Sequence, residues 1–325
     1  MIKQVIKLIL GQSKWNHLVS MIKYVKTQSY FKLGRNSIFQ LNEEWEKEEY
    51  YVEGKHTFFG YYDIAQMNIE EDKILAHVVK HNAVTSNDRA IVGYFSITEK
   101  KFVQITTTRA WCWQQGARLR WHPLNSNRII LNDVEDEHYI ARVVCLDTKE
   151  TERVIPMALY DIDNNFTYGL SLNFSRLQRL RPGYGYDTLN DETETENAPS
   201  KDGIFYLDLR SNQIKLLISL KDLANDVDSE MKYQHYINHI SIAPDGKSFI
   251  FFHIWNVPEF RNWKTRLCVY NLKTGKNRIL EEKDKVSHYD WKGNEELLVT
   301  CYTEKKEQYY AIYNTITGEK KNLTS

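Results

Sequence analysis

The chain has 325 residues, of which 42% are hydrophobic and 26% are charged, so it can bury a full core without disulfide or metal support. Its formal net charge is zero and its isoelectric point is near 7.1, which excludes a nucleic-acid partner held by an overall basic field. The four cysteines lie far apart, three of them in strand-like runs, which excludes a disulfide framework and is typical of a reducing compartment.

Residues 1–40 are predicted to form a basic amphipathic helical appendage. Between positions 1 and 35 there are seven Lys or Arg residues and no acidic residue, and apolar residues recur at helical spacing from Ile2 to Ile9 and from Trp15 to Val25. Such helices can lie on an anionic membrane surface or hold a partner such as a glycosyltransferase. The alternative is a helix packed against the rest of the chain with solvated lysines.

The location expected from the sequence is cytoplasmic. No stretch is long and apolar enough to span a bilayer, and no signal peptide with a small-residue cleavage site is visible. If the basic helices bind lipid, the protein lies peripherally on the inner face of the membrane.

Residues 41–325 carry a degenerate repeat: two β-rich runs joined by a turn, then a tail with an aromatic residue, Asp or Asn, and a polar turn. The hairpin around Pro244, Asp245 and Gly246 is the clearest example. A period of roughly 40 to 60 residues is typical of a radial array of four-stranded sheets. The predicted fold is therefore an all-β β-propeller with the N-terminal α-helical appendage. Five units are expected at 57–108, 117–155, 157–218, 237–281 and 286–323, and a sixth would have to come from irregular sequence.

Several of these units begin with polar and aromatic residues. The inner strands of a propeller begin around one mouth of its channel, so these residues are expected to converge there. We predict His56 or His288 as a catalytic base and Tyr62 or Tyr289 as an aid to proton transfer. Substrate-binding candidates at the same places are Asp63, Trp113, Gln114, Gln115, Arg118 and Asp290. The alternative is that these residues hydrogen-bond one blade to the next.

An insertion at about 178–202 interrupts the third unit. Gly and Pro shape its first half, where Arg181, Tyr184 and Tyr186 could close over an anionic or sugar ligand. A guanidinium group matches carboxylates and phosphates in shape and charge. Its acidic half, 187–200, is explained equally well by an exposed loop without a role.

Histidines cluster around the 244–246 hairpin. The turn places His253 opposite about residues 237–239, so His239 and His253 are expected to be neighbours. With Gln234 and His235 just upstream, these residues could bind one divalent metal that holds substrate carboxylates. The alternative is that the histidines bridge the strands and satisfy each other's hydrogen bonds.

The order of these motifs resembles a family of bacterial propeller proteins encoded among capsule, O-antigen and exopolysaccharide genes. The resemblance covers about residues 50–323 and rests on 56–63, 113–116, 181–186, 238–246 and 287–291. It implies the propeller fold and a role in surface-polysaccharide synthesis or processing.

More distantly, the chain resembles TolB-like propellers and the oligogalacturonate lyases. In those lyases, His and Gln ligands hold a metal that neutralises a uronate carboxylate during β-elimination. For this chain the resemblance implies one divalent metal, manganese or similar. The positions that could match this ligand set are Gln234, His235, His239 and His253.

Two functions follow as expectations. The favoured one is a carbohydrate-active, lyase-like enzyme that cleaves an acidic polysaccharide or lipid-linked oligosaccharide, by β-elimination or hydrolysis, at the funnel mouth. The alternative is a non-catalytic glycan-binding or scaffold subunit beside a membrane-associated glycosyltransferase. Sugar transfer by the protein itself has little support, because no Gly-rich strand-to-helix loop for a nucleotide phosphate is visible.

Overall fold

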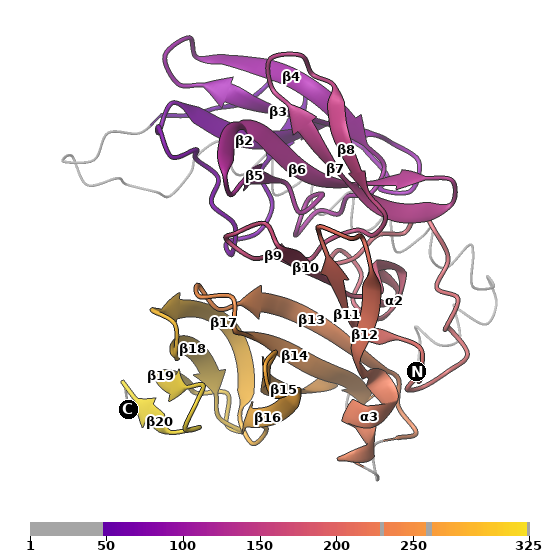
Figure 1. The fold of residues 1–325 in the computed structure, drawn as a ribbon, viewed down its shortest axis with the longest axis vertical. Helices are drawn as coiled ribbons and strands as arrows, with labels where there is room; N and C mark the ends of the chain where they lie inside the picture. The colour runs from indigo at the N-terminus through magenta and orange to yellow at the C-terminus, as the bar shows by residue number, and fades with distance from the viewer. Residues whose placement is uncertain (1–47, 228–230, 258–261, 324–325) are drawn as a thin grey trace, which may run out of the picture. The chain divides into compact units, whose positions relative to one another are not determined.

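The computed structural model describes residues 48–227, 231–257 and 262–323. Residues from Tyr50 onward belong to one compact unit. Within the described residues this unit is all-β, with five four-stranded antiparallel sheets and two short helices. Figure 1 shows the sheets following one another in chain order from indigo to yellow. The helical appendage expected at 1–40 lies outside the described residues.

Each sheet is an antiparallel meander whose strands are neighbours in chain order. The first contains β1 (His56–Phe58), β2 (Lys73–Val79), β3 (Ala90–Ser96) and β4 (Lys101–Thr108). The second contains β5 (Arg120–His122), β6 (Asn125–Glu135), β7 (His138–Cys145) and β8 (Thr151–Ile155). The third contains β9 (Asp161–Ile162), β10 (Tyr168–Ser171), β11 (Gly203–Asp208) and β12 (Ile214–Ser219). The fourth contains β13 (His235–Ile242), β14 (Ser248–Val257), β15 (Asn262–Asn271) and β16 (Lys276–Glu281). The fifth contains β17 (Lys285–Lys292), β18 (Glu296–Tyr302), β19 (Gln308–Asn314) and β20 (Lys320–Asn322).

The all-β prediction is confirmed, and each expected unit lies over one of these sheets. That five blades close the ring stays a prediction. The helices α2 (Phe174–Leu180) and α3 (Leu220–Asn225) both belong to the region around the third sheet. None of the helices in the described part of the chain has the length and apolar character that crossing a bilayer requires.

The repeated tail of the sequence forms the turn between the third and the outer strand of each sheet. In the turns of the third, fourth and fifth sheets an Asp or Asn side chain accepts hydrogen bonds from backbone N–H groups two or three residues further on, which is why these residue types favour turns. Asp208 accepts from Arg210 and Ser211 at 2.9 and 2.8 Å, and Asn314 accepts from Ile316 and Thr317 at 2.9 and 2.8 Å.

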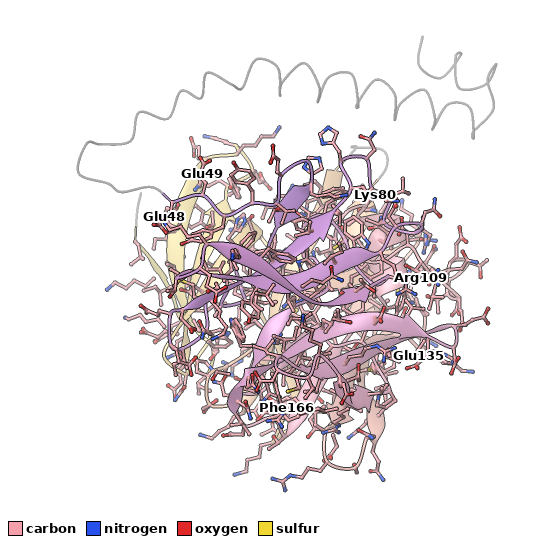
Figure 2. The ribbon with its side chains drawn as sticks, turned by 90° about the horizontal axis from the view of Figure 1, so that it is seen from above. Glu48, Glu49, Lys80, Arg109, Glu135 and Phe166 are labelled. Atoms are coloured by element: carbon pink, nitrogen blue, oxygen red, sulfur yellow. The ribbon has the colours of Figure 1, made fainter. Side chains whose placement is uncertain are left out.

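The core lies between the sheets, where the second strand of a sheet can be covered on both faces. In β14 every residue from Ser248 to Trp255 is buried, so the strand reads as an apolar run rather than as an alternating one. His253 is the one imidazole in that run. Exposed polar side chains such as Arg109 and Glu135 lie at the periphery in Figure 2.

Hydrogen bonds connect the sheets in a circular order. They run from the first sheet to the second, third, fourth and fifth in turn, and from the fifth back to the first. This order supports the radial arrangement that the repeats predict. The connecting bonds are Ala117 N to His77 Nε2 (3.0 Å), Arg120 Nη1 to Asp161 Oδ1 (2.6 Å), Ile242 N to Asp161 Oδ2 (2.7 Å), Trp291 Nε1 to Ser241 Oγ (3.0 Å) and Tyr289 N to the Tyr62 hydroxyl (3.2 Å).

The insertion is packed against the fourth sheet. The guanidinium group of Arg176, on α2, is buried and donates to the carbonyl oxygens of His235, Thr193, Glu196 and Asn197 at 2.7 to 3.0 Å. One buried cation is thus hydrogen-bonded to four backbone carbonyl groups, three of them in the insertion and one at the start of β13. The acidic half of the insertion is therefore part of the folded unit. Through Arg176 it is connected to His235, the first residue of β13.

Candidate functional site

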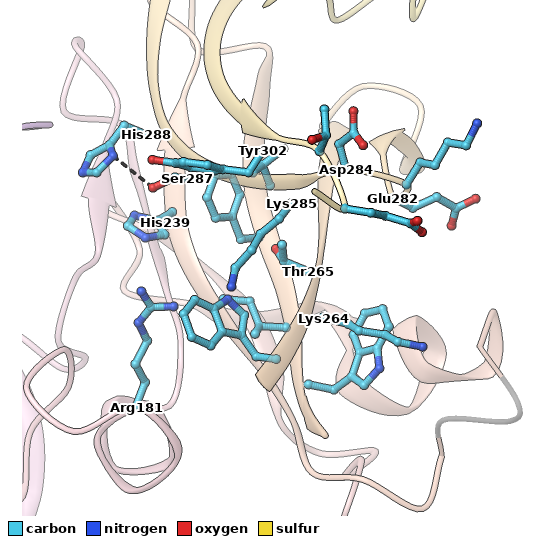
Figure 3. Close-up of a pocket in the computed structure, with 18 of the residues that line it drawn as sticks. Arg181, His239, Lys264, Thr265, Glu282, Asp284, Lys285, Ser287, His288 and Tyr302 are labelled. Carbon is cyan, nitrogen blue, oxygen red and sulfur yellow. Dashed lines mark hydrogen bonds between the residues drawn. The ribbon is translucent and has the colours of Figure 1, made fainter. Parts of the chain in front are cut away.

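A cavity of about 1250 Å³ opens where the loop after α2 meets the fourth and fifth sheets. Figure 3 shows most of its lining side chains; the lining comes from the loop before β2, the insertion, strands β13, β14, β15, β17 and β18, and loops beside them. Aromatic and cationic residues gather at this place. Those on which the argument rests are Tyr61, Arg181, Tyr184, His239, Trp263 and Lys285.

Tyr61 is the centre of an aromatic group at one end of the cavity. Its ring centroid lies 5.5 Å from that of His239, 6.1 Å from that of Tyr184 and 6.4 Å from that of His288. Burial, and after it the neighbouring phenol of Tyr184, raises the pKa of Tyr61, so its hydroxyl stays protonated. Flat neutral rings of this kind present a surface on which a sugar ring can stack.

Two β-bulges bring the histidines into this group. The register of β13 against β14 shifts between Asn238 and Ser241, and that of β17 against β18 shifts between Val286 and Tyr289. A bulge adds an unpaired residue and turns its side chain away from the regular alternation. Both His239 and His288 lie within these bulges and line the cavity.

The backbone at His239 is held in a left-handed conformation, with φ of 56°. Its N–H group donates to the Tyr160 hydroxyl at 3.0 Å, and its ring packs on Phe252. Burial, assisted by the positive charge of Arg181, lowers the pKa of His239 to about 3. No hydrogen-bond partner of the buried Nδ1 atom lies among the residues that the structure describes. His239 therefore presents a neutral imidazole, which suits binding better than proton transfer at neutral pH.

The strain at this residue predicts an order of stability among variants. Because an L side chain in the left-handed region costs about 1 kcal/mol, His239→Gly is expected to be more stable than His239→Ala by about that amount. Both variants remove the imidazole. The difference between their unfolding free energies in urea therefore measures the cost of the left-handed backbone at position 239. Equal stability of the two variants would contradict a strained backbone at position 239.

His288 is the exposed histidine of the cavity. Its Nδ1 atom lies 3.0 Å from the Ser287 hydroxyl, and its ring lies 4.9 Å from that of Tyr62. Figure 3 shows the Ser287–His288 contact at the edge of the lining. An exposed imidazole with one nitrogen held by a hydroxyl is suited to accept a proton from a bound substrate.

The other end of the cavity is cationic. The Arg181 guanidinium lies 5.1 Å from the ring centroid of Trp263, and the Lys285 ammonium lies 3.2 Å from the same centroid. Arg181 also lies 4.4 Å from the ring of Tyr184. Burial works against the charge of Arg181, but the neighbouring phenols of Tyr184 and Tyr236 outweigh it and raise the pKa of Arg181, and no carboxylate of the described residues pairs with it. This end of the cavity is therefore suited to an anion.

Three predicted substrate-binding residues lie instead at the junction of the inner strands. Asp63 accepts two hydrogen bonds from the Arg118 guanidinium at 3.0 and 2.9 Å, with both side chains buried. Gln115 Nε2 donates to the Tyr160 hydroxyl and to Asn238 Oδ1 at 3.0 and 3.2 Å. For Asp63, Gln115 and Arg118 the structure favours the alternative interpretation, in which these residues lock the sheets together.

The four candidate metal ligands do not converge. His253 pairs with Ile237 across the hairpin, as expected, but the bulge turns His239 away from it toward the cavity. His235 Nδ1 and His253 Nε2 lie 2.9 Å apart in the core, so these two imidazoles bridge strands as the alternative predicts. Gln234 bonds to Arg179 and to the Glu194 carbonyl.

Within residues 48–227, 231–257 and 262–323, no group of three or more His, Cys, Asp or Glu side chains is placed to hold a metal ion. The four predicted ligands therefore do not fit one metal, because the bulge divides them between the core and the cavity. No step of a reaction is assigned to a metal here.

The remaining candidates are spread over other places. His56 stacks on His81 with centroids 4.6 Å apart and lies beside Trp113, while the Gln114 N–H donates to the Gly183 carbonyl at 3.1 Å. Tyr62, Tyr289 and Asp290 line a second cavity of about 320 Å³. Tyr186 is fully buried and stacks on Phe174, so it supports the insertion and does not reach the cavity.

Most lining residues were not predicted from the sequence, among them Tyr61, Trp263, Thr265 and Lys285. The signal for Tyr61 was present, since Gly60, Tyr61 and Tyr62 stand next to each other at a unit start. The other three give no local signal, because Trp263 and Thr265 lie in an ordinary strand and Lys285 opens the next one.

No known protein-family model matches the chain, and no curated protein is similar to it in sequence. Comparison with solved structures does find similar folds. The matches include a puromycin-hydrolyzing peptidase of Mycobacterium tuberculosis, with a TM-score of 0.49 and 11% identity, covering 83% of this chain and 38% of that one.

Two other matches are of the kinds that the sequence motifs resemble. TolB from Acinetobacter baumannii has a TM-score of 0.45 and 14% identity over 78% of this chain, which spans about half of TolB, 53%. An oligogalacturonate lyase in complex with manganese has a TM-score of 0.42 and 11% identity, covering 82% of this chain and 78% of that one. The chain is thus similar to these proteins in fold.

Proposed function

We propose that the protein binds an acidic carbohydrate in the 1250 Å³ cavity and cleaves it. The observation that carries the proposal is the partly buried Arg181 guanidinium, which faces an aromatic-walled cavity and pairs with no carboxylate of the described residues. A charged guanidinium group that faces a cavity without a carboxylate partner can form charge-assisted hydrogen bonds with a bound anion. The rings around Tyr61 supply the stacking surface for the sugar.

In this proposal His288 is the proton acceptor. It lines the cavity beside the ring of Tyr61 and is exposed, so a substrate stacked on that ring would bring its reacting atoms toward the imidazole. His288 either removes a proton from carbon, which leads to β-elimination, or activates a water for hydrolysis. Neutral His239 orients a substrate hydroxyl through its unpartnered Nδ1 atom.

The biological setting follows from the motif resemblance. The substrate is a bacterial surface polysaccharide, such as a capsule or O-antigen chain, or its lipid-linked precursor. The protein acts in the cytoplasm, peripherally on the inner membrane face, where residues 1–40 bind the membrane or a glycosyltransferase. The alternative is a glycan-binding subunit without turnover, for which the same aromatic and cationic lining is suited.

Titration of the full-length protein with oligosaccharides, followed by tryptophan fluorescence, tests this proposal. An acidic oligosaccharide, bearing either uronate or phosphate groups, is expected to bind more tightly than its neutral homologue. Arg181→Met is expected to weaken the acidic ligand roughly 10- to 100-fold, the range for a lost charge-assisted hydrogen bond, and to leave the neutral ligand unchanged.

Lys273→Met, which removes an exposed cation from a turn of the fourth sheet, is the charge-matched control. If acidic and neutral ligands bind equally, or if Arg181→Met behaves like the control, the proposed site is wrong. Turnover separates the two candidate functions: His288→Ala abolishes cleavage in the enzyme and leaves binding intact, whereas a binding subunit cleaves none of the ligands that it binds.

A further inference from the structure

The second cavity, of about 320 Å³, has no part in the function proposed above. Its lining comes from the loop between β1 and β2, from β13 and from β17. Pockets that bind small ligands measure about 300–1,000 Å³, so this cavity is at the lower end of that range and suits a single sugar unit.

The two cavities adjoin each other at His288. Consecutive residues line different cavities: Tyr61 and His288 line the first, whereas Tyr62 and Tyr289 line the second. The ring centroid of Tyr62 lies 4.6 Å from that of Tyr61 and 4.9 Å from that of His288, which lies at the edge of the lining in Figure 3. A ligand longer than one sugar unit can therefore continue from the first cavity past His288 into the second.

Two aromatic walls of the second cavity are held by hydrogen bonds between sheets. Trp291 Nε1 donates to Ser241 Oγ at 3.0 Å, and the Tyr62 hydroxyl accepts from the Tyr289 N–H at 3.2 Å. Trp291 is half-buried and Tyr62 is 45% exposed, so part of each ring stays available to a ligand. Rings that are held in place and partly exposed are suited to packing against a sugar ring.

The second cavity differs from the first in charge. No Lys, Arg or His is among the described residues that line it, and its carboxylates are those of Asp63 and Asp290. Arg118 neutralises Asp63 through two hydrogen bonds, whereas Asp290 is exposed. A carboxylate accepts hydrogen bonds from sugar hydroxyls and repels a second carboxylate. This cavity therefore favours a neutral sugar over an acidic one.

A phenol adds a hydrogen-bond donor to this lining. Tyr289 is 5% exposed, and its hydroxyl has no hydrogen-bond partner among the residues that the structure describes. Burial, and after it the Asp63 carboxylate, raises the pKa of Tyr289, so the hydroxyl stays protonated. Buried hydroxyls are nearly always hydrogen-bonded, and a sugar hydroxyl is a partner that a ligand of this cavity can supply.

We propose that the second cavity is a subsite for a neutral sugar, and that the substrate is a mixed polymer in which acidic and neutral sugars are neighbours. This inference rests on the proposed function and specifies its substrate class. The Arg181 end of the first cavity takes the acidic sugar, while Asp290 and Trp291 take the neutral one. The bond that joins the two sugars then lies beside His288.

Calorimetric titration of the full-length protein tests the subsite. The probes are a hexuronate, the neutral hexose, a diuronate, and disaccharides of one hexuronate and one neutral hexose in both linkage orders, at one pH and ionic strength. One of the mixed disaccharides is expected to bind at least about tenfold more tightly than the hexuronate, because its neutral sugar adds a hydrogen bond to a charged group. The diuronate gains nothing, because its second carboxylate meets Asp290.

Asp290→Ala is the diagnostic variant. The side chain is exposed, so the substitution is expected to leave the unfolding free energy nearly unchanged. It should weaken the preferred mixed disaccharide about tenfold and leave the hexuronate unchanged. It should strengthen the diuronate about two- to fivefold, the range for one exposed charge interaction. Glu99→Ala removes an exposed carboxylate from the turn between β3 and β4, and this matched control should affect none of the probes.

The outcomes separate the two proposals. The neutral-sugar subsite is overturned, and the proposed function is left standing, if both mixed disaccharides bind no more tightly than the hexuronate or if the diuronate binds as tightly as the better of them. The same holds if Asp290→Ala binds the probes like the Glu99→Ala control. If neither the hexuronate nor any of the disaccharides binds more tightly than the neutral hexose, the proposed function itself is wrong.

Discussion

Lowering the pH from 7 to 5 is expected to reduce the free energy of unfolding by about 3–4 kcal/mol through two buried histidines, His77 and His239, and to reduce it further, in the same direction, through His253. Burial lowers the pKa of His77 to about 4 and that of His239 to about 3, and it holds the pKa of His253 well below its usual range. In the unfolded chain each imidazole titrates near pH 6.5, so below that pH the unfolded state binds more protons than the folded state.

The sign of the effect follows from this difference. The stability is fully present above pH 6.5 and is lost as the pH falls from 6.5 toward the lowered folded-state values, at about 1.4 kcal/mol per histidine and pH unit. Urea unfolding at pH 7 and pH 5 measures the loss. Asn tolerates the left-handed conformation at position 239 and does not titrate, so His239→Asn should reduce the stability loss between pH 7 and pH 5 by about 2 kcal/mol.

Unchanged stability between pH 7 and pH 5 would contradict the burial of these imidazoles. An unchanged pH dependence in His239→Asn would contradict only the contribution of position 239. The two results therefore test the fold and the site separately.

Asp63→Asn is expected to destabilise the protein by about 3–5 kcal/mol, the range for removal of one partner from a buried ion pair. Burial alone would raise the pKa of Asp63, but the Arg118 guanidinium outweighs it and holds the pKa below its ordinary value. The substitution leaves the Arg118 charge buried, with its side chain 1% exposed. Urea unfolding at pH 7 measures the loss.

A double variant and an exposed pair provide the controls. Asp63→Asn combined with Arg118→Met should cost less than the sum of the two single variants, because no unpaired charge remains. Lys292 and Glu296 lie 2.9 Å apart but are solvent-exposed, so Glu296→Gln is expected to cost less than about 1 kcal/mol. Additive effects at positions 63 and 118 would mean that the pair is not coupled.

Much of the fold could be predicted because its signals are local. The hairpin at Gly246, with φ of 70°, and the Asp or Asn turns at residues such as Asp208 and Asn314 depend only on neighbours in sequence. Such signals repeat once per sheet, so the position of each sheet could be predicted closely. The sequence also shows that the units begin with polar residues. It does not show whether such a residue hydrogen-bonds one sheet to the next or faces a ligand.

The candidate site was predicted only in part. Arg181, Tyr184, His239 and His288 line the cavity, as a convergent site requires, whereas His253 and Tyr186 are buried in the core. The two histidines were expected to be neighbours, but a bulge shifts the register of β13 and separates His239 from His253. A bulge depends on how the strand packs against its neighbours, so a one-residue uncertainty in sequence becomes a change of face in the structure.

By itself the sequence determined the all-β class, the chain order of the sheets and the turn chemistry, since strand periodicity and turn preferences act over a few residues. Only the tertiary structure decided which polar residues meet. Trp263 and Thr265 come from the third strand of one sheet, Lys285 from the first strand of the next, and Arg181 from an insertion in a third. Their juxtaposition depends on the packing of whole sheets against one another, which no local pattern encodes.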